Sequence, residues 1–284
     1  MRDTTIDVSV VVPMRNEAGN IDYLIGGLET ACAGLRFEVV CIDDGSDDDT
    51  GAMLERAAAT RLWLRMVHHP VSAGQSAAIH SGVLAARAPV ICTMDGDGQN
   101  PPAEVPRLVS LLSMQSGAAG LVAGQRVNRK DTWSKRWASR FANALRSAML
   151  GDGTRDTGCG LKAFQRDDFL ALPYFDHMHR FLPALFRAHG HPVRLIDVSH
   201  AERHAGRSNY TNFQRALVGI ADLFGVMWLI RRRKRVRPDT VRWPDGQTPR
   251  LVRHHEHARP HLDGSGSQRP ADVLGALPDP VDQF

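Results

Sequence analysis

The chain has 284 residues, 43% of them hydrophobic, so it is long enough to bury a sizeable core in one large or two small domains. The formal net charge of +4 is unevenly spread, because basic residues cluster at Arg231–Arg235 and in the segment after it. No aromatic-interleaved or helix-turn-helix pattern accompanies this cluster, so nucleic acid is not an expected partner. The amino-terminal segment lacks an apolar signal region and the apolar stretch 216–230 is short for a bilayer. We therefore expect neither a secretory signal nor a transmembrane helix.

Strand and helix patterns alternate along the first 125 residues. Apolar runs predict strands at 8–12, 37–42, 62–67, 89–94 and 121–123, and helical spacing predicts helices at 21–28 (with Asn20 as N-cap), 50–59 and 73–86. This alternation is typical of an α/β fold in which a mostly parallel sheet carries helices on both faces. The four cysteines form no Cys-x-x-Cys pair, which predicts buried free thiols.

Polar loops follow three of the predicted strands. They are Pro13–Glu17, Asp43–Ser46 and Asp95–Asn100. Because ligands of parallel sheets collect at the carboxyl ends of the strands, we expect these loops to form one site. Asp95 and Asp97 offer the carboxylate oxygens that Mg²⁺ or Mn²⁺ prefers, leaving room for a diphosphate. A polar turn without a metal is the alternative interpretation of the same residues.

The chain from residue 126 onward is rich in Arg, Lys and His. A helix is predicted through Arg126–Arg140, and Asp156–Lys162 is predicted to be a glycine-rich turn. The stretch 212–230 is helix-like and mostly apolar, and basic residues follow it directly, so we expect it to lie at a membrane interface. A buried core helix is the alternative for this stretch. The segment 236–284 has no apolar periodicity and is predicted to be a disordered tail.

These motifs together resemble the family 2 glycosyltransferases of the GT-A fold, and within them the dolichyl-phosphate mannose synthase-like, polyprenyl-phosphate branch. The resemblance is carried by Val10–Glu17, Asp43–Ser46, Asp95–Gln99, Gly124–Arg126, Asp156–Lys162 and Arg203–Ser208. It implies a Rossmann-like sheet and transfer of a sugar, with inversion, from a nucleotide diphosphate sugar to a polyprenyl phosphate. It further implies a peripheral enzyme on the cytoplasmic face of the inner or plasma membrane.

The resemblance also implies a division of the chain. It predicts a nucleotide-sugar-binding half at 1–125, an acceptor-binding half at 126–210, an interfacial helix at 211–235 and the tail at 236–284. The implied site residues fall into two groups. The metal and phosphate group comprises Asp95, Asp97 and Gln99 as ligands of Mg²⁺ or Mn²⁺, Gly96 between them, Arg126 and Arg203 at phosphates, Arg136 at the acceptor phosphate and Asn209 near the donor phosphates. The nucleoside group comprises Pro13, Arg15 and Glu17, with Ile42 and Asp44 at the base and ribose.

Several alternatives are weighed against this interpretation. A sugar-1-phosphate nucleotidylyltransferase needs a glycine-rich phosphate loop after the first strand, where this chain has Pro13–Glu17. A processive polysaccharide synthase needs several membrane spans, and a non-enzymatic binding protein would not need both Asp95 and Asp97. A glycosyltransferase with a different acceptor stays open. The donor also stays open among GDP-mannose, UDP-glucose and other UDP-sugars, because Arg15 stands where many mannose synthases have an aromatic residue.

Overall fold

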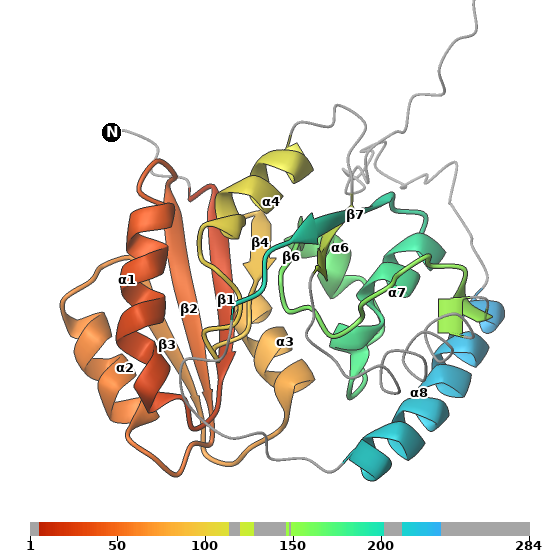
Figure 1. Cartoon of the computed structure of the whole chain (residues 1–284), viewed down its shortest axis with the longest axis horizontal. Coiled ribbons are helices and arrows are strands. Elements are labelled where there is room, and N and C mark those ends of the chain that lie inside the picture. The colour runs from red at the N-terminus through yellow and green to blue at the C-terminus, as the bar shows by residue number, and fades with distance from the viewer. Residues whose placement is uncertain (1–5, 114–119, 128–145, 148, 202–211, 234–284) are drawn as a thin grey trace, which may run out of the picture.

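The computed structural model describes residues 6–113, 120–127, 146–147, 149–201 and 212–233, and for 212–218 the backbone alone. Seven strands of this part form one sheet in the order β3-β2-β1-β4-β6-β5-β7 (Figure 1). The strands are β1 (Val8–Met14), β2 (Phe37–Asp44), β3 (Leu64–His69), β4 (Val90–Thr93), β5 (Leu121–Arg126), β6 (Lys162–Gln165) and β7 (Val193–Val198). β6 runs antiparallel to β4 and β5, whereas the other neighbours are parallel. The predicted mostly parallel α/β sheet is confirmed.

Helices cover both faces of the sheet (Figure 1). One apolar cluster packs α1 (Ile21–Ala31), α2 (Thr50–Ala59) and α4 (Glu104–Ser113) against one face. A second cluster packs α3 (Gln75–Ala85), α6 (Arg166–Leu170), α7 (Leu182–Ala188) and α8 (Asn212–Arg232) against the other. Two short 3₁₀ helices, η1 (Ala18–Asn20) and η2 (Met178–Arg180), complete the described elements. Because both faces are covered, β1 is apolar at nearly every position rather than at alternate ones.

The elements predicted in the first half are present to within a few residues of their expected ends. Arg126, however, ends strand β5 and does not begin a helix, so that prediction was wrong at this residue. The rest of the predicted helix, beyond Val127, and the tail 236–284 lie outside the described residues. Asn20 does precede α1, but its side chain donates a hydrogen bond to Glu17 (2.5 Å) instead of capping the helix.

α8 has one face against the protein and one face exposed. Val226 is buried in the second apolar cluster, and Leu223 packs against the same cluster, so these two side chains face the protein and not the membrane interface that was expected for 212–230. Ile220, Phe224 and Trp228 are 55%, 55% and 59% exposed and recur at a spacing of four, which places them on one side of the helix. Within the described residues, no helix combines the length and the apolar character needed to cross a membrane.

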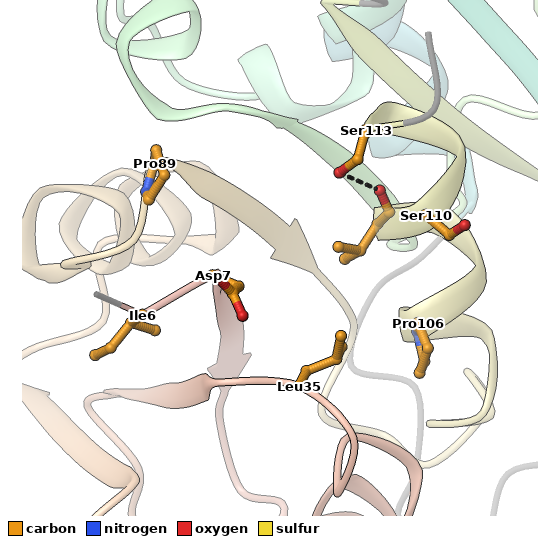
Figure 2. A pocket seen from close by; sticks show the side chains of 8 residues that line it. Ile6, Asp7, Leu35, Pro89, Pro106, Ser110 and Ser113 are labelled. Atoms are coloured by element: carbon orange, nitrogen blue, oxygen red, sulfur yellow. Dashed lines mark hydrogen bonds between the residues drawn. The ribbon is translucent and has the colours of Figure 1, made fainter. Parts of the chain in front are cut away.

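A cavity of about 410 Å³ lies at the amino ends of β1 and β4 (Figure 2). Ile6, Leu35, Pro89 and Pro106 give it a largely apolar wall, to which Asp7 contributes a carboxylate. The polar loops identified in the sequence follow the carboxyl ends of the same strands. The cavity therefore lies at the edge of the sheet opposite the predicted site.

Candidate active site

The sheet brings two of the predicted loops into direct contact. β1 lies between β2 and β4, so the loop after β1 meets the loop after β4. Gly96 marks the closest approach, because a side chain there would come within 2.9 Å of Met14 Cγ and 3.0 Å of the Pro13 carbonyl oxygen. A glycine between Asp95 and Asp97 thus lets the two loops pack together.

Asp95 is the centre of the site. Its carboxylate accepts hydrogen bonds from Gln75 Nε2 (2.7 Å) and from Asn100 Nδ2 (3.2 Å). Gly160 passes directly against it, since a Cβ at that position would lie 2.4 Å from the carboxyl atoms. Burial raises the pKa of Asp95 above its ordinary value, and the neighbouring Asp97 raises it further.

The residues present fit a divalent cation. Asp95 and Asp97 are like charges on one short loop, and a cation bound there would offset the repulsion from Asp97, which adds to the larger effect of burial on the pKa of Asp95. Their donors are oxygens, which suit Mg²⁺ or Mn²⁺. In the described part of the chain no group of three or more His, Cys, Asp and Glu side chains is arranged to hold a metal. The two carboxylates would leave positions on a bound cation for phosphate and water, as magnesium sites often do.

Gln99 lies on the same loop. Its backbone N–H donates to Asp97 Oδ1 (3.1 Å), and its carbonyl oxygen accepts a hydrogen bond from the backbone N–H of Ala201 (2.9 Å). These bonds fix the loop that carries Asp97 and tie it to the segment after β7. The role of Gln99 as a third ligand stays a prediction.

Arg126 forms a bidentate ion pair with Asp156. Arg126 Nε and Nη2 donate to the two carboxylate oxygens at 2.5 and 2.8 Å. Burial alone would lower the pKa of Arg126, but the bonds to Asp156 outweigh it and raise the pKa above its ordinary value. Gln125 holds Asp156 in place, because its amide oxygen accepts the backbone N–H of Asp156 (3.0 Å). The guanidinium is therefore fixed in orientation and permanently charged.

Lys162 places a second cation beneath this site. It pairs with Thr93 at the start of β6, is only 5% exposed, and donates a hydrogen bond to the Cys159 carbonyl oxygen. Burial lowers the pKa of Lys162 from its ordinary value, and the nearby Asp95 opposes the shift. Cys159 and the other three cysteines are buried free thiols, as predicted.

Asp43 and Asp44 are held by the protein itself. Asp44 accepts hydrogen bonds from His69 Nδ1, Ser72 Oγ and the backbone N–H groups of residues 73 and 74, all between 2.8 and 2.9 Å. Burial would raise the pKa of Asp44, but these bonds hold it below its ordinary value. Asp43 accepts the backbone N–H of Ser46 (3.1 Å), so its side chain caps the turn after β2. Asp44 as a ribose ligand stays a prediction.

The loop after β1 is anchored to the loop after β2. Asn16 adopts a left-handed conformation (φ 56°), and its backbone N–H donates to Ser46 Oγ (3.0 Å). Glu17 donates its backbone N–H to Thr50 Oγ1 (2.9 Å). Arg15 is exposed at the site, whereas the Ile42 side chain is buried in the core. Three further predicted site residues, Arg136, Arg203 and Asn209, lie outside the described residues.

Several residues of the site were not singled out from the sequence. Gln75 and Asn100 hold Asp95, Asp156 holds Arg126, and Lys162 lies below them. Asp156 and Lys162 end a motif that carried the resemblance, and Gln75 lies in the predicted helix 73–86, but the sequence alone assigned no role to these residues. Their function depends on contacts between segments far apart in the sequence.

Comparison with known proteins agrees with this geometry. Residues 9–172 match the model of a family described as Glycosyl transferase family 2. The chain belongs to this family. It is 36% identical over 208 residues to an undecaprenyl-phosphate 4-deoxy-4-formamido-L-arabinose transferase of Pseudomonas syringae pv. syringae (strain B728a), covering 72% of this chain and 60% of the relative. The protein of the same name from Sodalis glossinidius (strain morsitans) is 35% identical over 207 residues, covering 72% and 63%. The chain thus spans about three fifths of the length of these relatives.

Solved structures share the fold of this family 2 member. Glucosyl-3-phosphoglycerate synthase from Mycobacterium tuberculosis, in complex with Mn²⁺, uridine diphosphate and glucosyl-3-phosphoglycerate, aligns with a TM-score of 0.60 at 21% identity over 80% of each chain. The same synthase with Mg²⁺ and uridine diphosphate aligns with a TM-score of 0.58 at 23% identity, over 80% of this chain and 79% of that one. The likeness confirms the GT-A fold that the sequence motifs implied.

Proposed function

We propose that this chain moves a sugar, with inversion, from a nucleotide diphosphate sugar to the phosphate of a polyprenyl lipid. The observation that carries the proposal is the meeting of the Asp95–Asp97 loop with the Gly160 turn, which gathers two carboxylates and the fixed cation Arg126 at the carboxyl edge of the sheet. Membership of family 2 supports glycosyl transfer. The names of the relatives support undecaprenyl phosphate, or a similar lipid phosphate, as the acceptor.

Asp95 and Asp97, with Gln99, would hold Mg²⁺ or Mn²⁺. When bound, such an ion neutralises the negative charge that gathers on the leaving nucleoside diphosphate. Gln75 and Asn100 orient the Asp95 carboxylate through their side-chain amides. These residues are therefore positioned before the substrate arrives, which is the condition for efficient electrostatic stabilisation.

Arg126 is suited to hold a phosphate. Its two hydrogen bonds to Asp156 use two of the five guanidinium N–H groups, and no other hydrogen bond of this side chain occurs within the described residues. The remaining donors can bind phosphate oxygens while Asp156 fixes the plane of the group. The acceptor phosphate is itself largely ionised at neutral pH, so it needs positioning more than it needs a strong base.

α8 supports a peripheral position on the cytoplasmic face of the membrane. Ile220, Phe224 and Trp228 form an exposed apolar stripe, and the exposed Arg231 and Arg232 follow it at the end of the helix. The Arg232 guanidinium lies 5.8 Å from the centre of the Trp228 ring, which keeps a cation beside the apolar stripe. Basic residues near an anionic surface contribute about 1 kcal/mol each, and an amphipathic helix of this kind lies in the interface plane.

The activity is tested by a donor and acceptor screen. Purified protein receives radiolabelled GDP- and UDP-sugars with undecaprenyl phosphate or with phosphoglycerate, in the presence of Mg²⁺ or Mn²⁺. We expect label in the lipid fraction with one donor, lost in Asp97→Asn and kept in Asp167→Asn, whose side chain is 77% exposed. Label in phosphoglycerate and not in lipid would show that the acceptor is a small phosphate compound and not a lipid. No transfer with any pair would refute the proposal.

The membrane contact is tested by vesicle flotation. Replacing Ile220, Phe224 and Trp228 together by Ser should reduce flotation with vesicles that contain phosphatidylglycerol. Leu62→Ser is the matched control, because Leu62 is a fully exposed apolar residue that precedes β3, far from α8 in the sequence. Equal flotation of the triple variant and the control would assign membrane binding to another part of the chain.

A further inference from the structure

α8 contacts the rest of the protein through a polar pair of side chains, His177 and Asp222, as well as through apolar packing. His177 Nδ1 lies 3.0 Å from Asp222 Oδ2. This carboxylate oxygen is buried and accepts no hydrogen bond in the part of the chain that the structure describes. The imidazole is therefore the group that offsets its burial, and the contact ties the helix to the segment before η2.

His177 adopts a strained backbone conformation. Its φ of 61° is left-handed, and among the described residues only Asn16 shares this feature without being a glycine. Such conformations persist where the surroundings fix them, and they gather at functional sites. Asn16 lies in the loop after β1, at the candidate active site. His177 is connected to the same site through the segment 176–179 and the amino end of α3.

The segment from Asp176 to His179 packs on the amino end of α3. His179 Nδ1 lies 2.7 Å from Ser76 Oγ, and the backbone N–H of His179 donates to the same oxygen (3.3 Å). A side chain at Gly74 would come within 3.8 Å of Asp176 Oδ1. Ser76 is almost fully buried, so this contact is part of the packing and not a surface encounter.

The amino end of α3 in turn holds the centre of the site. Gln75, the first residue of α3, donates to Asp95 Oδ1 (2.7 Å). A continuous run of contacts therefore leads from Asp222 on α8 through His177 and His179 to Ser76 and Gln75, and ends at Asp95. Packed side chains and hydrogen bonds of this kind are the physical means by which one surface affects another.

We propose that His177 and Asp222 are positioning residues that couple the docking of α8 on an anionic bilayer to the placement of Gln75 against Asp95. The inference rests on the proposed function, in which α8 contacts lipid and Asp95 serves sugar transfer. Docking on the bilayer immobilises α8, the contact between His177 and Asp222 holds the segment 176–179 against α3, and the site becomes ordered. The enzyme then works fastest where its lipid acceptor resides.

The test compares vesicle stimulation in wild type with that in two variants that cut the pair. Asp222→Asn removes the charge, and His177→Asn shortens the side chain while keeping a residue that tolerates the left-handed backbone. Asp168→Asn is the matched control, since it weakens a similar contact, His191 Nδ1 to Asp168 Oδ2 at 3.3 Å, outside this run. Transfer to a water-soluble, short-chain polyprenyl phosphate is measured with and without acceptor-free phosphatidylglycerol vesicles.

A second readout does not depend on catalysis. Hydrogen exchange is followed in peptides covering 73–80 and 175–181, with and without the same vesicles. In wild type and Asp168→Asn we expect stimulation of at least about fivefold and slower exchange in both peptides. In Asp222→Asn and His177→Asn we expect unchanged flotation, stimulation close to onefold, and exchange in 73–80 that no longer responds to vesicles.

Equal stimulation of transfer by vesicles in the two variants and in the wild type would overturn the coupling. The same holds if hydrogen exchange in peptide 73–80 of the wild type does not change when vesicles are added. Loss of flotation in Asp222→Asn would also contradict it, because the pair would then belong to the docking surface itself. Failure of the wild type to transfer sugar to any acceptor would refute the proposed function instead, and the exchange measurements would still decide the coupling.

Discussion

Asp44 and Asp95 both stand at the carboxyl edge of the sheet, one at the end of β2 and the other just after β4. Asp44 accepts four hydrogen bonds from the segment 69–74, and they keep its pKa below the ordinary value. Asp95 accepts two, both from side-chain amides, and its pKa is raised. Ionised Asp44 is thus stabilised by the fold, whereas ionised Asp95 still lacks a full set of partners.

The difference separates a structural carboxylate from one prepared for a ligand. Four donors fill the lone-pair directions of a carboxylate, so Asp44 in this arrangement is best placed to hold the loop that leads into α3. Asp95 keeps acceptor capacity and has Asp97 as a like charge nearby, which is the pattern expected where a cation binds.

Asp97→Asn should reduce the transfer rate by at least a hundredfold. Removing one interaction that stabilises charge in the transition state typically costs about 3 kcal/mol or more. The substitution changes a loop residue and not the packing, so thermal unfolding should be unaltered. Initial rates and calorimetry on the same preparation check both points. Near-normal activity in this variant, or full activity in excess EDTA, would show that the site does not use a metal.

Asp44→Asn should instead lower stability. The amide NH₂ group would face N–H donors in place of an acceptor oxygen, leaving buried groups unsatisfied at a cost of about 2 kcal/mol. Chemical denaturation measures the loss, with Asp167→Asn as the exposed control. A variant of wild-type stability with a weakened affinity for the donor would show that Asp44 is a ribose ligand, as the sequence resemblance implied.

Much of the fold was within reach of the sequence. Continuous apolar strands and polar loops at their ends predicted the sheet through β5, and the edge at which the site lies. The pattern in Asp95–Gln99 predicted two carboxylates at that edge, and their role as cation ligands stays a prediction. Periodicity failed after residue 126, because β6 has four residues and β6 and β7 are set by pairing with distant strands. The turn before Lys162 belongs to the site through contacts with β4 and β5 that no local pattern encodes.

The roles of the two carboxylates could not be separated from the sequence. Asp43–Asp44 and Asp95–Asp97 look alike as acidic loops after strands. What distinguishes them is the set of donors brought by His69 and Ser72 in one case and by Gln75 and Asn100 in the other. His69, Ser72 and Gln75 lie 20 to 28 residues from the carboxylates that they bind, so they become neighbours only when the sheet is assembled, whereas Asn100 lies on the same loop as Asp95.

Arg126→Lys should reduce transfer about tenfold and leave the fold intact. Lysine keeps the charge but lacks the planar guanidinium group. That group binds both carboxylate oxygens of Asp156 and has further N–H donors for a phosphate. Steady-state kinetics with varied acceptor should show the loss, and circular dichroism should remain unchanged. Arg155→Lys is the matched control, because its pair with Asp197 is well exposed on both sides. Wild-type kinetics in Arg126→Lys would place the phosphate contact elsewhere.

Asp95→Asn should make the protein more stable while abolishing its activity. The folded pKa of Asp95 lies above the ordinary value of 3.8, so the folded protein retains a proton that the unfolded chain has already released. The stability that this group contributes is greatest below pH 4 and is lost as pH rises through the folded pKa.

Asn cannot ionise, so the variant avoids the loss, and Gln75, which is exposed, can rotate its amide to suit the new side chain. We expect a gain of about 1 kcal/mol at pH 8 in EDTA, or a melting temperature higher by roughly 2–4 °C, and a smaller gain at pH 5. Thermal unfolding at the two pH values decides the matter: a variant that melts at or below the wild-type temperature at pH 8 would mean that Asp95 is as well satisfied by the fold as Asp44.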